Sequence, residues 1–156
     1  MTIFVPFTLS AVRALRSSGS ARDLIGYAAG PALRSWLVDA RLDDEEADYV
    51  ALNHAAIAAL TFADPTATRI VLAVDQETGG GDELGAVTVA LLEWAEVRSL
   101  FADEAAAASA VLAARTAVRG FELAAALTAP SVEELQESYD LLWYAPEELD
   151  SLAPST

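Results

Sequence analysis

The run Arg69–Asp75 (RIVLAVD) constrains the fold most, because it holds five consecutive apolar residues, three of them β-branched. A strand that is apolar at every position needs burial on both faces, which suits the centre of a sheet. Two further strands are predicted over residues 85–92 and 97–102. The first is expected to form a hairpin with 69–75 across the polar connection QETGGGDELG.

The N-terminal part alternates strand and helix signals. Residues 2–7 predict a first strand, and Thr8 is placed to cap a helix that ends in the turn SSGS. A second extended segment is predicted over 24–28. It leads to Pro31, which favours the first position of a helix over residues 31–39. Strand followed by helix indicates a fold with both element types.

A long helix is predicted over residues 44–62. Asp43 stands at the N-cap with Glu46 three residues later, the capping-box arrangement, and acidic residues in the first turn complement the helix dipole. Asp64–Pro65 ends the helix. Its apolar stripe has helical spacing and comprises Ala47, Val50, Ala51, Ile57, Ala58 and Phe62.

The C-terminal third is mostly helical by composition and spacing. A helix from about residue 104 is expected to bend at Gly120 and finish before Pro130. Ser131 and Glu134 form a second capping box that predicts the start of another helix.

The segment LLWYA, residues 141–145, is apolar at every position. Both of its faces therefore require burial, and it is predicted to be either a central strand or part of an interface. Pro146 then begins a last helical turn, and the tail from about residue 151 is expected to fray. Trp36, Leu37, Trp94 and Trp143 lie in apolar segments and are predicted to pack in the core.

These elements predict an α+β fold, with one compact domain over residues 1–156 and a mixed β-sheet with helices packed on it. Helix should exceed strand, because the chain contains 34 alanines. No repeat and no linker separates two domains. At 156 residues the chain is large enough to bury a core without a disulfide or metal.

Absent residue types exclude several kinds of chemistry. Cysteine and lysine do not occur, and histidine occurs once. A thiol nucleophile, a thiolate zinc site, a lysine Schiff base and a P-loop lysine are therefore excluded. We predict no cofactor and no metal site, and these absences favour a non-enzymatic protein.

The net charge of −15 opposes binding to nucleic acid and to anionic membranes. Residues 1–42 nevertheless hold five arginines against two aspartates, whereas residues 120–156 hold eight acidic residues and no basic one. The N-terminal arginines either pair with acidic residues of the same fold or form a small cationic patch. The chain shows no targeting signal and no membrane-length apolar stretch, which predicts a cytoplasmic protein.

His54 is the one candidate for acid–base work near neutral pH. It lies on the apolar stripe between Val50 and Ala58, so a buried structural histidine is the simpler interpretation. The alternative is a small-molecule, metal-binding or hydrolytic site near His54, built with Tyr49 and nearby carboxylates. A divalent cation would be sought in the acidic loops 43–48 and 75–83, although the second lacks the EF-hand ligand pattern.

Several segments carry a family resemblance. They are VPFTL at 5–9, GPALRSWL at 30–37, the acidic start of the alanine-rich helix at 43–60 and, above all, LLWYAPEEL at 141–149. Together they resemble a family of small acidic actinobacterial proteins described as a domain of unknown function. In that family a histidine and a glutamate often precede LLWYA, whereas this chain has Tyr139 and Asp140. The resemblance implies no activity, so no catalytic residue carries over.

Together these observations predict a cytoplasmic, non-enzymatic domain that binds a protein partner or associates with itself as a homodimer. The apolar segment at 141–145 and the arginine-bearing N-terminal region are the expected contact surfaces. Loss of a buried Trp143 side chain is predicted to cost about 3–5 kcal/mol of stability. The candidate binding residues are His54, Tyr49, Arg34, Trp143 and Tyr144.

Overall fold

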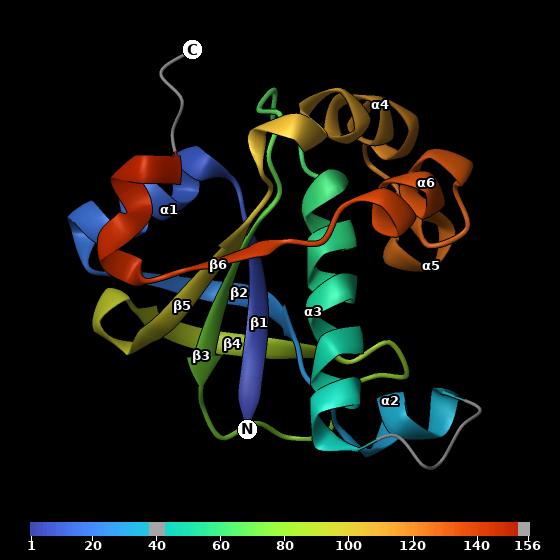
Figure 1. The fold of residues 1–156 in the computed structure, drawn as a ribbon. Coiled ribbons are helices and arrows are strands. Elements are labelled where there is room, and N and C mark those ends of the chain that lie inside the picture. The colour runs from blue at the N-terminus through green and yellow to red at the C-terminus, as the bar shows by residue number, and fades with distance from the viewer. Residues whose placement is uncertain (38–42, 153–156) are drawn as a thin grey trace.

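A computed structural model describes residues 1–37 and 43–152. Six strands form one sheet in the order β4-β2-β1-β3-β5-β6, and each neighbouring pair is antiparallel (Figure 1). The α+β fold is confirmed, although the sheet is antiparallel throughout where we predicted a mixed one. The strands are β1 (Thr2–Phe7), β2 (Ser20–Tyr27), β3 (Ile70–Asp75), β4 (Ala86–Glu93), β5 (Val97–Ala102) and β6 (Leu142–Tyr144).

The predicted central strand is confirmed as β3. It pairs with β1 on one side and β5 on the other, and residues 70–74 are all buried. The predicted hairpin between β3 and β4 is wrong, because β1 and β5 occupy both edges of β3. The connection 76–85 instead carries the chain to the far edge of the sheet, where β4 pairs with β2.

The helices begin at the predicted caps in two of the three cases. The Thr8 hydroxyl accepts the Ala11 amide at 3.1 Å, and an Asp43 carboxylate oxygen accepts the Glu46 amide at 2.8 Å. The helices and 3₁₀ turns are α1 (Leu9–Ser18), α2 (Pro31–Trp36), α3 (Asp44–Leu60), η1 (Trp94–Glu96), η2 (Ala105–Ala107), α4 (Ala108–Val118), α5 (Leu123–Ala126), α6 (Pro130–Ser138) and η3 (Pro146–Leu152).

The capping box predicted at Ser131 is wrong. Helix α6 begins at Pro130 with Ala129 as its N-cap and no side-chain cap. Proline fits the first helical position, because its φ is already helical and its missing N–H is not needed there. The predicted bend at Gly120 is confirmed, since this residue has a φ of +75° and separates α4 from α5.

One residue of helix α2 that we predicted to lie in the core, Trp36, is not buried. Leu33 is fully buried, whereas the Trp36 side chain is 42% exposed and lies edge-on to the His54 ring, with 5.6 Å between the ring centroids. A six-residue helix presents little surface to the core, so Trp36 covers His54 with one side of its ring and leaves the rest in solvent. Leu37 is partly buried against the core, and residues 38 and 39 of the predicted helix lie outside the described residues.

The helices form layers around the sheet (Figure 1). Helix α1 and η3 pack on one face of the sheet, and α3 packs on the other. Helices α4, α5 and α6 pack against the far end of α3 and form a third apolar cluster. Trp94 packs at the edge of the first cluster, as predicted. Ser151 and the buried Leu152 belong to η3, and the rest of the predicted frayed tail lies outside the described residues.

Among the described helices, none combines the length and apolar character that a membrane span requires.

Candidate functional site

Strand β6 forms one edge of the sheet, so the prediction that LLWYA supplies a central strand is wrong. Only residues 142–144 pair with β5, and the side chains of Leu142 and Trp143 are 41% and 60% exposed. The predicted burial of Trp143 is therefore wrong as well. No described strand or helix covers the outer side of β6, whereas Tyr144 is half-buried against the core beneath η3.

A shallow groove of about 320 Å³ lies beside Trp143 on the sheet face that carries α3. The register explains its shape, because Phe4 opposes Ala73, Ala73 opposes Ser99, and Phe101 opposes Trp143. The face of β1, β3, β5 and β6 on the α3 side is therefore continuous, and it ends at the exposed indole of Trp143. We call this surface, together with Leu142, the β6 edge; the groove is lined by Thr2, Phe4, Ala73, Arg98, Ser99, Phe101 and Trp143.

The segment before β6 is held by two polar contacts. The Tyr49 hydroxyl of α3 donates to an Asp140 carboxylate oxygen at 2.8 Å, and the Arg69 guanidinium donates to the Tyr139 carbonyl at 3.4 Å. The hydrogen bond to Asp140 is the main cause that raises the pKa of Tyr49. After β6, a Glu148 carboxylate oxygen accepts the Ala145 amide at 3.0 Å. Both ends of the edge strand are therefore fixed to the fold.

Arg69 and Asp103 form a buried ion pair behind this segment. Their side chains are 2% and 0% exposed. One Asp103 oxygen accepts both the Arg69 backbone amide at 2.7 Å and Nε at 3.0 Å, and the other accepts a terminal guanidinium nitrogen at 2.7 Å. The two side-chain hydrogen bonds of this pair and the added backbone hydrogen bond offset much of the free-energy cost of burying two charges.

Arg115 extends this buried cluster from α4. Its guanidinium donates to the carbonyl oxygens of Ala59, Thr66 and Thr68 at 2.7–2.8 Å, and it lies 3.6 Å from an Asp64 oxygen. Burial lowers the pKa of Arg115, and Asp64 and Asp103 oppose that shift. We call Arg69, Asp103, Arg115 and Asp64 the buried charge cluster.

The polar groups of the buried charge cluster are paired with one another and with the backbone. In the described part of the chain, every fully buried polar side-chain atom has a hydrogen-bond partner. Sequence reasoning missed this cluster, although one signal was present. Arg115 lies on the apolar stripe of α4 between Val111 and Val118, where a charge needs an internal partner.

His54 is 4% exposed, as the structural interpretation predicted. Its Nδ1 lies 2.8 Å from the Leu84 carbonyl oxygen, which can only accept, so Nδ1 carries the proton. Burial lowers the pKa of His54, and the bond to Leu84 and the charge of Asp82 oppose this shift. A neutral His54 therefore ties α3 to the loop before β4.

The other candidate residues do not gather around His54. Tyr49 bonds Asp140, and Arg34 forms an ion pair with Asp44 at 2.6 Å. Arg16 pairs with Asp150 at 2.9 Å. The prediction that N-terminal arginines pair within the fold is confirmed for Arg16 and Arg34 but not for Arg13 and Arg22, which form no ion pair among the described residues. Arg41 lies outside the described residues.

The two acidic loops have structural roles. Asp43 caps α3, and an Asp82 carboxylate oxygen accepts the amides of Leu84 and Ala86 at 2.9 Å each. Within residues 1–37 and 43–152, no group of three or more metal-ligating side chains is placed to hold an ion.

One comparison with known proteins matches the chain to a family whose function is not known. The model of a family of unknown function (DUF6912) matches residues 1–153, which is more of the chain than the segments that carried the resemblance. No curated protein and no solved structure matches the chain. The comparisons therefore assign no site residue, and the geometry alone carries the functional argument.

Proposed function

This chain belongs to the family of unknown function DUF6912, and we propose that it is a protein-binding domain whose β6 edge receives an extended, basic segment of a partner. The observation that carries the proposal is the exposure of Trp143 and Leu142 on an edge strand whose two ends are fixed. An open strand edge offers unpaired backbone groups to another chain. Tryptophan is enriched among the residues that dominate binding energies.

The acidic segments on both sides of β6 support a basic partner. The one arginine that lines the groove, Arg98, already pairs with Asp75. Asp140 precedes the strand and Glu147 follows it, and both are exposed. No arginine or lysine occurs from residue 120 onward, against eight acidic residues. A segment in which arginine or lysine alternates with apolar residues would place its apolar face on Trp143 and its charges toward these carboxylates.

The same charges disfavour the alternative occupant, a second copy of the chain. A two-fold pairing of β6 with β6 would bring two acidic C-terminal regions together, because an isologous contact uses the same surface twice. We therefore expect a monomer in sedimentation velocity at all concentrations. A concentration-dependent dimer that Trp143→Ser abolishes would replace the basic partner with a second copy.

A peptide titration tests the proposal. The probe is a labelled six-residue peptide that alternates arginine and valine, measured by fluorescence anisotropy at low salt. We expect saturable binding that weakens as salt rises, because exposed charges are screened. A glutamate–valine peptide should not bind, and an arginine–proline peptide should bind poorly because proline has no N–H to donate to a strand.

Matched variants locate the binding surface. Trp143→Ser should weaken binding at least tenfold, because it removes the exposed anchor. Leu112→Ser is the control, since Leu112 is 44% exposed on α4 and lies away from the sheet edge. The proposal is wrong if both variants change the affinity equally, or if the arginine–proline peptide binds as well as the arginine–valine peptide.

A further inference from the structure

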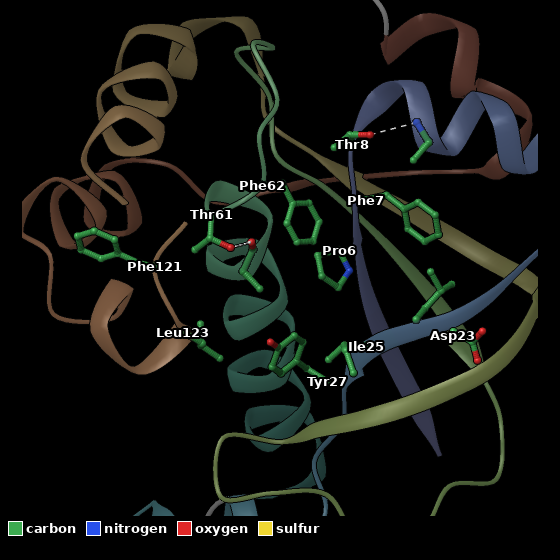
Figure 2. Close-up of a pocket in the computed structure, with 13 residues that line it drawn as sticks. Pro6, Phe7, Thr8, Asp23, Ile25, Tyr27, Thr61, Phe62, Phe121 and Leu123 are labelled. Carbon is green, nitrogen blue, oxygen red and sulfur yellow. Dashed lines mark hydrogen bonds between the residues drawn. The ribbon is translucent and has the colours of Figure 1, made fainter. Parts of the chain in front are cut away.

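A second and larger groove lies where β1 and β2 separate, apart from the β6 edge (Figure 2). The two strands share one register pair, Phe4 with Tyr27, whereas β2 pairs with β4 along nearly its whole length. Pro6 follows on β1 and has no N–H to offer a neighbouring strand. The space beyond this point is a groove of about 500 Å³, which we call the β1–β2 groove.

The groove is apolar on both sides. Figure 2 shows Ile25 and Tyr27 on β2, Phe62 just beyond α3, and Phe121 and Leu123 on the segment that leads into α5. Ile25 and Phe121 are 52% and 46% exposed, an unusual exposure for side chains of this size. A concave apolar surface of this volume is the size of a small-molecule site.

Tyr27 supplies a hydrogen-bonding group that the fold does not use. Its side chain lines the groove, and its hydroxyl makes no hydrogen bond within the described residues. Every fully buried polar side-chain atom in these residues has a partner, so this unpartnered hydroxyl is open to the groove. Burial, and then the charge of Asp82, raises the pKa of Tyr27 and keeps it protonated. The phenol can therefore donate to a ligand in the groove.

Asp23 is the one charged residue that lines the groove, and its backbone is strained. Its φ of +56° is the one positive value at a non-glycine position among the described residues. Within these residues its carboxylate has no basic partner. Strain of this kind persists where the surrounding structure fixes it, and it is frequent at ligand sites.

Asp23, Ile25 and Tyr27 follow one another along the groove (Figure 2). Ile25 and Tyr27 share one face of β2, whereas the positive φ of Asp23 interrupts the alternation of side chains. The groove therefore presents a carboxylate near one end, a phenol near the other, and an apolar surface between them.

We propose that the β1–β2 groove binds a small, ring-containing amine. The ring body packs against Ile25 and Phe62, and the ammonium group faces the Asp23 carboxylate. Tyr27 lies farther along the groove, where its hydroxyl can donate to a polar atom of a longer ligand. The net charge of −15 favours a cation and opposes an anion. This site uses none of the residues that line the β6 edge, so either proposal can fail alone.

Three probes with one ring system test the proposal by ligand-observed NMR. They are 2-(aminomethyl)naphthalene, 2-naphthalenemethanol and 2-naphthoate, which are cationic, neutral and anionic near neutral pH. We expect the affinity to fall in that order. Asp23→Asn should weaken the amine about two- to fivefold, to the level of the alcohol, since an exposed ion pair contributes about 0.5–1 kcal/mol.

Variants of the apolar wall separate the groove from non-specific binding. Ile25→Ser should weaken all three probes about tenfold, because Ile25 is an exposed part of the apolar wall next to Asp23. Leu112→Ser, on α4, should change none of them. The proposal is overturned if the carboxylate binds as well as the amine, if no probe binds at millimolar concentration, or if Ile25→Ser and Leu112→Ser behave alike.

Discussion

The buried charge cluster and the β6 edge lie at the two ends of one short segment, residues 139–144, and they use opposite chemistry. Arg69 contacts the Tyr139 carbonyl at the start of this segment, where charged groups are buried and fully bonded. At its end, Leu142 and Trp143 leave apolar surface in solvent. The strongest polar groups of this chain therefore stabilise the fold, whereas the surface that we propose for binding is apolar.

Asp103→Ala should have the largest effect on stability. Removal of this carboxylate leaves the Arg69 guanidinium buried without its partner, which typically costs about 3–5 kcal/mol. Chemical denaturation measures the free energy of unfolding. Asp150→Ala is the control, because Asp150 is 81% exposed in its pair with Arg16 and should contribute less than about 1 kcal/mol. Equal losses from the two variants would contradict a structural role for the cluster.

Arg115→Met should lower the free energy of unfolding by about 3 kcal/mol. The variant keeps much of the side-chain volume but leaves three carbonyl oxygens without their guanidinium donor and removes the cation that pairs with Asp64. Arg119→Met makes the same change at an exposed position one residue beyond α4, and it should alter stability by less than about 0.5 kcal/mol.

The free energy of unfolding should fall below about pH 6.5 through His54. Burial lowers the pKa of His54 in the folded state, so the unfolded chain binds a proton first as the pH falls. The loss cannot exceed about 1.4 kcal/mol per pH unit for one proton. His54→Gln keeps a donor for Leu84 and removes the titration. We expect the wild-type curve to lose more stability than this variant between pH 7 and pH 5, and parallel curves would refute the effect.

Trp143→Ala should change the free energy of unfolding least, by about 0.5 kcal/mol or less, because most of its side chain is already in solvent. The sequence predicted a buried tryptophan, whose loss would instead have cost about 3–5 kcal/mol. Leu100→Ala, at the fully buried β5 residue that opposes Tyr144, should cost about 2–5 kcal/mol. A large loss from Trp143→Ala would mean that the β6 edge is part of the core.

Sequence patterns predicted most of the elements, because their signals are local. The apolar run at 70–74 required a strand buried on both faces, and Thr8 and Asp43 are capping residues that contact amides three positions away. Strand pairing depends on contacts between distant segments. The hairpin between β3 and β4 was therefore predicted wrongly, since no local signal shows that β1 and β5 pair with the two sides of β3.

For the β6 edge, the sequence predicted an apolar segment but not its exposure. The run LLWYA indicated a strand or an interface. A pattern of apolar residues shows that a segment favours burial, but it does not show whether another part of the fold packs over that segment. Arg69 and Asp103 are 34 positions apart, so no spacing rule connects them. Tyr27 and Asp23 gave no signal, because a missing hydrogen bond and a positive φ are visible only in the structure.

Hydrogen–deuterium exchange with the arginine–valine peptide shows whether a partner strand pairs with β6. We expect slower exchange in residues 142–144 when the peptide is bound, because an added strand would form hydrogen bonds with the free edge of β6. The opposite edge strand, β4, serves as the internal reference and should not change. Unchanged exchange in β6 at saturating peptide, or protection of β4 alone, would contradict the account.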